Sequence, residues 1–217
     1  KGSDIYFYFY STNIYSFNVK GKERLNDHQW KIVSWPNYLV WNETQKLFVE
    51  KTPFAKKNIE ITGIIPFSSN NKLLTQDNSA NILIVFDVQP VRTSFYQSLG
   101  IGYEYYSSKN GTDFIMHIDQ IAKALKLKVI FKRKRNISIL DKKYLKTIEK
   151  LFLTGRWVEI DPDVDAHLVC EKFKAIASIS APFTSTAMIS DSFGIPTIYY
   201  DVTEELNEKS SASNKFK

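Results

Sequence analysis

Cysteine is almost missing from this sequence, and glycine, proline and long apolar runs are scarce. Cys170 is the single cysteine, which excludes an internal disulfide and argues against a cysteine-rich zinc site. Eight glycines and seven prolines in 217 residues exclude a collagen-like chain. No apolar run approaches the roughly 18 residues that span a bilayer, and the best one, Asn81–Val88, has the length of a strand. These absences predict a soluble protein of a reducing compartment.

Metal-ligand spacing is also lacking, because His28, His117 and His167 lie far apart in the sequence. Apolar residues, in contrast, are plentiful. The chain is 43% hydrophobic, 14% aromatic and 24% charged, so it can bury a sizeable core and is not a disordered chain. A length of 217 residues suits one domain, or a small domain with a half-domain attached.

Positive charge is concentrated in one window of the sequence. The formal net charge is +6, but residues 122–150 alone carry +9, from 11 basic residues and two acids. A local field of this kind attracts phosphates, nucleic acid or an anionic membrane surface. The run Lys132–Arg135 directly follows an apolar strand, which favours an anion site there. A solvated helix face is the favoured interpretation of the later lysines, Lys142, Lys143, Lys146 and Lys150.

The second half of the chain alternates strands and helices with short connections, which is typical of a parallel sheet covered on both faces. The expected strands are Asn81–Val88, Lys128–Lys132, Trp157–Ile160, Ala175–Ser180 and Pro196–Tyr200. The expected helices are Thr112–Leu125, one from the N-cap Asp141 to Phe152, one opened by Asp163 or Asp165 and ending at Phe173, and Thr184–Phe193. The pattern predicts an α/β fold with a Rossmann-like parallel sheet.

The first 75 residues contain too few elements of this kind for a complete domain. The expected pieces are strands at Ile5–Tyr10, Lys31–Ser34 and Glu60–Ile65, a strand followed by a helix in Tyr38–Val49, and a polar linker at Ser68–Ala80. We therefore predict three regions. Residues 1–75 are part of one α/β domain, 76–202 are nearly all of a second, and 203–217 are a frayed or truncated tail.

Three hydroxyl side chains in a row mark a candidate phosphate site. Thr184, Ser185 and Thr186 follow a buried strand and open a helix, and Pro182 fixes the turn before them. Free N–H groups and the positive end of the helix dipole lie at such a start. Plain capping needs only one hydroxyl, so three in succession favour phosphate binding.

Basic residues after an adjacent strand form the second candidate. In a doubly wound sheet both loops emerge at the same edge, so cations and hydroxyls could converge on one phosphate or diphosphate. Because alternate residues of a strand point to opposite faces, Lys132 and Lys134 are expected to face the site while Arg133 points elsewhere. Arg135 is a further candidate once the chain turns.

An acidic residue ends the first strand of the second half. Asp87 could serve as a general base or bind a sugar hydroxyl, and a structural role in capping the turn is an equal alternative. Arg92, five residues later, could pair with a phosphate. Glu43 could face the cleft from the amino-terminal region, although ordinary surface or core is the favoured interpretation. Gly100 and Gly102 lack the following helix and third glycine of a dinucleotide fingerprint.

Two segments together resemble a known family. The segment Ser180–Ser185 (SAPFTS), followed by Gly194–Asp201 (GIPTIYYD), resembles bacterial surface-polysaccharide biosynthesis proteins that are named for their PFTS motif. More distantly, the chain is similar to Kdo-transferase-like and sialyltransferase-like enzymes of the GT-B glycosyltransferase architecture. The similarity runs from Ile5 to Asp201.

The resemblance implies two Rossmann-like domains that face a cleft. Residues 76–202 would be the GT-B type carboxyl-terminal domain, which holds a nucleotide-sugar donor, and residues 1–75 a remnant of the acceptor-side domain. Thr184 and Ser185 would contact the donor phosphate. The sialyltransferase-like enzymes have a His-Pro pair where Lys132-Arg133-Lys134 stands here, so a permanent cation would stabilise the departing phosphate.

The expected function is therefore that of a cytoplasmic glycosyltransferase for bacterial capsule or lipopolysaccharide-type glycans, with Asp87 and Glu43 as the expected catalytic residues. A CMP-activated sugar such as Kdo or a sialic-acid-like residue is the first choice of donor, and neither a cofactor nor a metal is expected. The acceptor would be a glycan or a lipid-linked sugar, and the basic charge would hold the protein at the inner face of the cytoplasmic membrane.

Two other functions stay open. A polyol-phosphate transferase acting on a CDP-activated donor would need a similar phosphate cradle. A basic module that binds nucleic acid is disfavoured, because only Phe131 and Tyr144 interleave with the basic residues of the 122–150 window.

Overall fold

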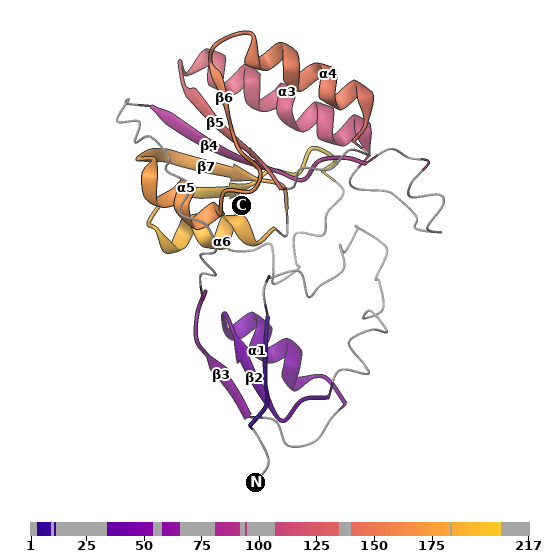
Figure 1. Cartoon of the computed structure of the whole chain (residues 1–217), viewed down its shortest axis with the longest axis vertical. Helices are drawn as coiled ribbons and strands as arrows, with labels where there is room; N and C mark the ends of the chain where they lie inside the picture. The colour runs from indigo at the N-terminus through magenta and orange to yellow at the C-terminus, as the bar shows by residue number, and fades with distance from the viewer. Residues whose placement is uncertain are drawn as a thin grey trace. The chain divides into compact units, whose positions relative to one another are not determined.

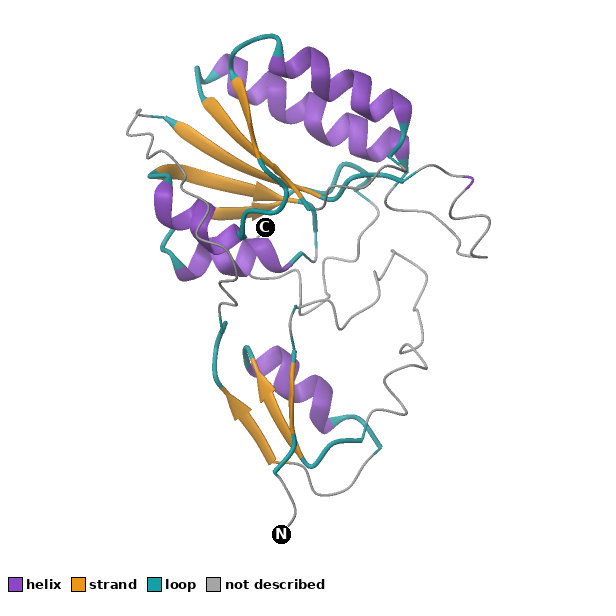
Figure 2. Cartoon of the chain, in the orientation of Figure 1, coloured by secondary structure: helices purple, strands orange, loops and turns teal. Residues whose placement is uncertain are grey.

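Parallel strands with helices between them make up both parts of the structure (Figures 1 and 2). The structure is a computed structural model, and it describes residues 4–9, 11, 34–53, 58–65, 81–91, 94, 107–134, 140–182 and 184–204. The chain divides into two compact units. Most of the amino-terminal unit is Lys1–Phe67, and most of the carboxyl-terminal unit is Ser68–Pro182 and Thr186–Glu204. The predicted domain boundary at residue 75, the predicted linker and most of the predicted tail fall outside the described residues and stay predictions.

Five parallel strands form the sheet of the carboxyl-terminal unit. They are β4 (Ile82–Asp87), β5 (Lys128–Arg133), β6 (Trp157–Ile160), β7 (Ala175–Ser180) and β8 (Thr197–Tyr199), and their spatial order is β6-β5-β4-β7-β8. All four neighbouring pairs are parallel. The predicted α/β fold class with a Rossmann-like sheet is therefore confirmed, and β6 and β7 have the predicted bounds.

Helices cover both faces of this sheet. In Figure 1, α3 (Ser108–Ala124) and α4 (Lys142–Phe152) lie together on one face, and α5 (Ala166–Lys172) and α6 (Ser185–Ser192) lie on the other. The core beneath α3 and α4 contains Leu83 and Val85 of β4 packed with Phe131 of β5. Since side chains alternate along a strand, Asp87 shares the α3–α4 face with Leu83 and Val85.

Side-chain caps explain where the helices begin. The Asp141 carboxylate accepts hydrogen bonds from the backbone N–H groups of Lys143 and Tyr144, so α4 begins as predicted. Of the two predicted openers of α5, Asp165 is the N-cap. The helix α3 begins four residues before the predicted Thr112, because Ser107 caps it by accepting from the Asn110 N–H group.

The amino-terminal unit contains a smaller parallel sheet, in the order β1 (Tyr6–Tyr8), β2 (Asn37–Val40) and β3 (Asn58–Ile61), with one helix, α1 (Glu43–Glu50). Gln45 fixes the turn between β2 and α1. Its side chain accepts from the Trp41 N–H group at 2.7 Å, and its own N–H group donates to the N-cap Asn42 at 2.9 Å. Most of the strand predicted at Lys31–Ser34 lies outside the described residues.

Candidate functional site

The strand order defines one special point in the carboxyl-terminal unit. The chain passes from β4 outward to β5 and β6, then crosses to β7 and β8 on the other side of β4. The direction of the connections thus reverses between β4 and β7. Ligands of open parallel sheets bind beyond the carboxyl ends of the strands at this kind of point.

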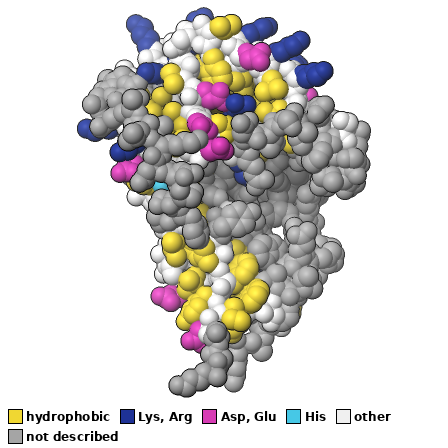
Figure 3. Space-filling view, viewed as in Figure 1, with side chains coloured by type: hydrophobic (Ala, Val, Ile, Leu, Met, Phe, Trp, Pro, Cys, Tyr) yellow, Lys and Arg dark blue, Asp and Glu magenta, His cyan; other side chains and the backbone are white. Residues whose placement is uncertain are grey.

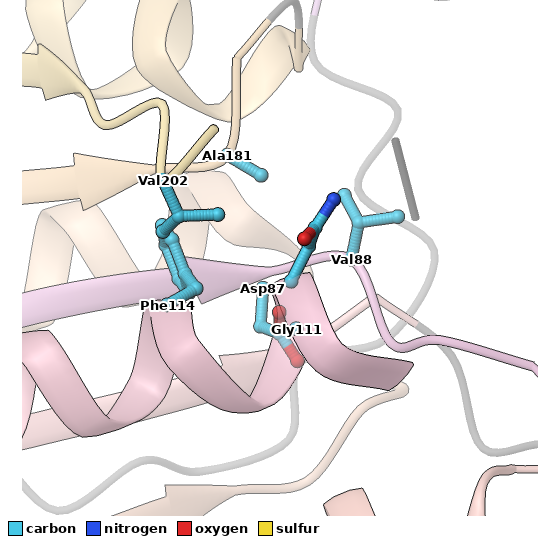
Figure 4. Close-up of a pocket in the computed structure, with 7 residues that line it drawn as sticks. Asp87, Val88, Gly111, Phe114, Ala181 and Val202 are labelled. Atoms are coloured by element: carbon cyan, nitrogen blue, oxygen red, sulfur yellow. The ribbon is translucent and has the colours of Figure 1, made fainter. Parts of the chain in front are cut away.

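A pocket lies at this position (Figure 4). Asp87 and Val88 line it from the end of β4, and Ala181 lines it from the end of β7. The beginning of α3 and the segment after β8 supply the remaining lining residues, which are Asn110, Gly111, Phe114 and Val202. All seven residues belong to the carboxyl-terminal unit. We call this site the Asp87 pocket.

The polar group of most interest in the pocket is the Asp87 carboxyl. Its side chain is 4% exposed, and its Oδ2 atom has no hydrogen-bond partner among the described residues. Burial raises the pKa of Asp87 from the usual 3.8 to about 7, although the Val88 N–H group and the charge of Arg133 act in the opposite direction. Asp87 therefore combines a raised pKa with one oxygen that has no partner in the described part of the chain.

Arg133, a charged neighbour of Asp87, is already engaged by another residue. Arg133 lies opposite Asp87 in the β4–β5 register, and its Nε atom donates to Glu159 of β6 in a salt bridge. The guanidinium therefore lowers the pKa of Asp87 from a distance but supplies no hydrogen bond to Oδ2. A buried polar atom left in this way costs free energy unless a ligand or water satisfies it.

Gly111 holds the wall of the pocket close to β4. A Cβ atom on this residue would lie 2.9 Å from both Cδ and Cγ of Pro90. Glycine therefore allows the segment that follows β4 to pack directly against the first turns of α3. The sequence interpretation did not single out Asn110, Gly111, Phe114 or Val202. A glycine inside an otherwise helical pattern was the available signal, since it often marks close packing.

The predicted cation Lys132 lies on the other face of the sheet. It is 7% exposed, and its Nζ atom donates to the carbonyl oxygens of Pro162 at 3.1 Å and Arg133 at 3.2 Å. Burial lowers the pKa of Lys132, and the nearby Asp165, Asp161 and Asp163 oppose that shift. Its ammonium group therefore fixes the turn before α5 and places positive charge on the α5–α6 face.

Lys134 follows the end of β5, and its side chain is exposed. Its backbone N–H group donates to the side chain of Gln89 at 3.1 Å, which ties the end of β5 to the segment after β4. Arg92 and Arg135, the other two predicted phosphate ligands, lie outside the described residues. The structure therefore describes two of the four predicted basic residues, Lys132 and Lys134, and their convergence on a phosphate stays a prediction.

The PFTS turn, residues 182–185, connects β7 to α6. Pro182 and Thr184 are buried, and Ser185 and Thr186 are partly exposed. The Thr186 hydroxyl lies 3.1 Å from the Ser180 hydroxyl at the end of β7, so this side chain helps to join strand and helix. The turn therefore stands at the carboxyl end of the strand next to β4, as predicted, with Phe183 outside the described residues.

The predicted catalytic residue Glu43 belongs to the amino-terminal unit. It stands in the first turn of α1, its side chain is 69% exposed, and it forms an ion pair with Lys46 at 3.6 Å. Asp87, the other predicted catalytic residue, belongs to the carboxyl-terminal unit. A catalytic role for Glu43 stays a prediction.

Basic side chains are visible along the α3 and α4 side of the carboxyl-terminal unit in Figure 3. The four lysines assigned to a solvated helix face are all exposed on α4. Of the helices in the described part of the chain, none has the length and apolar composition needed to cross a bilayer. Within the same residues, no group of three or more histidine, cysteine or acidic side chains could hold a metal ion.

A family comparison covers the whole sequence. The family model described as polysaccharide biosynthesis PFTS motif protein matches residues 1–217. The chain belongs to this family. The PFTS family takes its description from polysaccharide biosynthesis, and its motif is the turn that leads into α6. No curated protein and no solved structure matches the chain.

Proposed function

We propose that this PFTS family protein is a glycosyltransferase that moves a sugar from a nucleotide-activated donor during the synthesis of a bacterial surface polysaccharide. One observation carries the proposal above the others: the Asp87 pocket and the PFTS turn stand at the ends of β4 and β7, where the connections of the sheet reverse. Parallel sheets bind nucleotides at this position. The family's assignment to polysaccharide biosynthesis supplies the sugar chemistry.

The donor phosphate would bind at the start of α6. Thr184, Ser185 and Thr186 place backbone N–H groups and hydroxyls there, and the helix dipole favours an anion. Lys132, buried on the same α5–α6 face, would add positive charge as the nucleotide leaves. We therefore propose that protein groups alone stabilise the leaving group, without a metal or cofactor.

A CMP-linked sugar is our first choice of donor, and a glycan or lipid-linked sugar is our choice of acceptor. The sequence resemblance to Kdo- and sialyltransferase-like enzymes supports the choice of CMP. Exposed lysines on α4 support peripheral contact with an anionic membrane at its cytoplasmic face, where lipid-linked acceptors would be located. Nucleic acid is not a proposed partner.

Nucleotide binding tests the proposal most directly. Calorimetry with the whole chain would compare CMP, UMP and GMP against buffer. The test variant combines Thr184→Ala with Ser185→Ala. Its matched control combines Thr147→Ala on α4 with Ser192→Ala at the last residue of α6, which removes one threonine and one serine hydroxyl outside the PFTS turn.

We expect CMP to bind the native protein and the control variant, and to bind the test variant at least about tenfold more weakly, as expected when charge-assisted hydrogen bonds are lost. A preference for UMP or GMP would support the proposed transferase activity but would indicate a UDP- or GDP-linked donor in place of a CMP-linked one. Failure of the folded native protein to bind any of the three nucleotides would contradict the proposed function.

A further inference from the structure

One buried acidic side chain and one buried basic side chain stand on opposite faces of the sheet, at the ends of adjacent strands. Asp87 ends β4 on the α3–α4 face, and Lys132, the partner of Phe86 in the β4–β5 register, lies on the α5–α6 face. The surroundings of each group agree with this placement. Asp87 lines a pocket with three residues of α3, and Lys132 bonds to the turn that precedes α5.

This arrangement separates the kinds of ligand group that each face accepts. On the α5–α6 face, Lys132 stands near the carboxylates of Asp161, Asp163 and Asp165, so the proposed phosphate site there is the start of α6. On the Asp87 face a phosphate would meet an ionisable carboxyl whose neighbouring guanidinium is held by Glu159. Like charges in a buried site repel strongly, so the Asp87 pocket disfavours phosphate.

The pocket instead fits a neutral group that donates a hydrogen bond. The free Oδ2 atom of Asp87 needs a donor, and the space in the pocket is about that of one water-sized group. Four lining side chains are apolar, namely Val88, Phe114, Ala181 and Val202. A hydroxyl on a sugar ring satisfies both requirements, because the O–H group reaches Oδ2 while the C–H groups of the ring contact the apolar wall.

We infer that the Asp87 pocket binds a sugar hydroxyl of the substrate, with Asp87 Oδ2 as the acceptor. The inference rests on the proposed function, because it places the sugar portion of a nucleotide-linked ligand on the α3–α4 face and its phosphate on the α5–α6 face. The sugar is either the ribose of the nucleotide or the transferred sugar. Both present the same hydroxyl chemistry, and the experiment separates them.

The test uses Asp87→Leu, which removes the acceptor at similar size, and Asp87→Asn, which keeps a carbonyl oxygen. Asp113→Asn is the matched control, because it removes one carboxylate from α3, a helix that lines the pocket, at a solvent-accessible ion pair with Lys109. The probes are CMP, UMP and GMP, their 2′-deoxy and 3′-deoxy forms, and CMP-N-acetylneuraminic acid, UDP-glucose and GDP-mannose.

If the ribose occupies the pocket, Asp87→Leu weakens the best-binding nucleotide about tenfold or more and abolishes its preference over the deoxy forms. If the transferred sugar occupies it, Asp87→Leu leaves the nucleotide unchanged and weakens the corresponding nucleotide sugar by a similar factor. The affinity of Asp87→Asn should fall between the affinities of Asp87→Leu and the native protein. Asp113→Asn should have the affinity of the native protein.

Unchanged affinity of Asp87→Leu for every probe, in a protein that still binds a nucleotide, would overturn the inference and leave the proposed function standing. Equal losses in Asp87→Leu and Asp113→Asn would also overturn it, because a general charge effect would then explain both. If none of the nucleotides binds the native protein, the proposed function fails and this inference fails with it.

Discussion

Replacing Asp87 with asparagine is expected to stabilise the protein by an amount that grows with pH. The Asp87 carboxyl is buried, its Oδ2 atom lacks a partner among the described residues, and its pKa rises from 3.8 to about 7 on folding. Because the folded state holds this proton more tightly than the unfolded state, the neutral carboxyl contributes its full stability below pH 3.8. That contribution is lost as the pH rises through 7.

The size of the effect follows from the shift. Each pKa unit corresponds to about 1.4 kcal/mol, so a rise from 3.8 to about 7 makes the ionised form cost about 4 kcal/mol in the folded protein. More than half of this cost appears between pH 5 and pH 8. Asparagine has the same shape and no charge, so Asp87→Asn removes the pH-dependent contribution of this residue to the unfolding free energy.

Urea unfolding at several pH values between 5 and 8 measures this pH-dependent contribution to the unfolding free energy directly. Other groups also titrate in this range, so the informative quantity is the difference in unfolding free energy between Asp87→Asn and the native protein at each pH. Asp113→Asn, at a solvent-accessible position, is the control. A difference for Asp87→Asn that stays constant from pH 5 to 8 would refute the description of Asp87 as a buried carboxyl with a raised pKa.

Three further predictions concern other parts of the chain. Gly111→Ala should lower the unfolding free energy by about 1–3 kcal/mol in urea titrations, because its Cβ would meet the Pro90 ring at 2.9 Å. If the alanine instead stabilised the protein, as it does at an ordinary helical glycine, this packing would be contradicted. Lys132→Met should lower the affinity for the best-binding nucleotide about tenfold in calorimetry, whereas Lys146→Met on α4 should leave it unchanged. Equal affinities of the two variants would contradict a role for Lys132 in phosphate binding. Leu125 and Leu153, the C-cap residues of α3 and α4, are 61% and 88% exposed. The double variant Leu125→Glu, Leu153→Glu should therefore reduce the fraction of protein that sediments with phosphatidylglycerol vesicles. Leu47→Glu on α1 should not reduce it, and equal losses would contradict a membrane contact at these helix ends.

The strands and most helix starts of the carboxyl-terminal unit could be predicted because local signals determine them. A short apolar run specifies β7, and the Asp141 carboxylate caps α4 within three residues of itself. The first turn of α3 could not be predicted in the same way. Gly111 weakens the helical pattern there, and the reason for a glycine is the Pro90 ring, which contacts it only in the folded protein.

In the candidate site, too, local sequence signals could be predicted and tertiary contacts could not. Asp87 could be selected from its place at the end of an apolar strand, but its unpaired oxygen depends on where Arg133 and Glu159 meet. The sequence pattern predicted that Lys132 would face the ligand. The structure shows in addition that its ammonium group binds two carbonyl oxygens, of which Pro162 lies in a later turn. Residues such as Val202 reach the pocket through tertiary packing, for which periodicity contains no signal.

The central place of β4 has a consequence for how the chain is made. This strand is the first of its sheet to leave the ribosome, yet one of its two neighbours, β7, is separated from it by β5, β6, α3, α4 and α5. Until β7 is synthesised, an apolar strand with the sequence ILIVFD has one open edge. Open edges of this kind pair readily with other chains. Nascent chains that stop before residue 175 should therefore aggregate more, and recruit chaperones more, than chains that include β7.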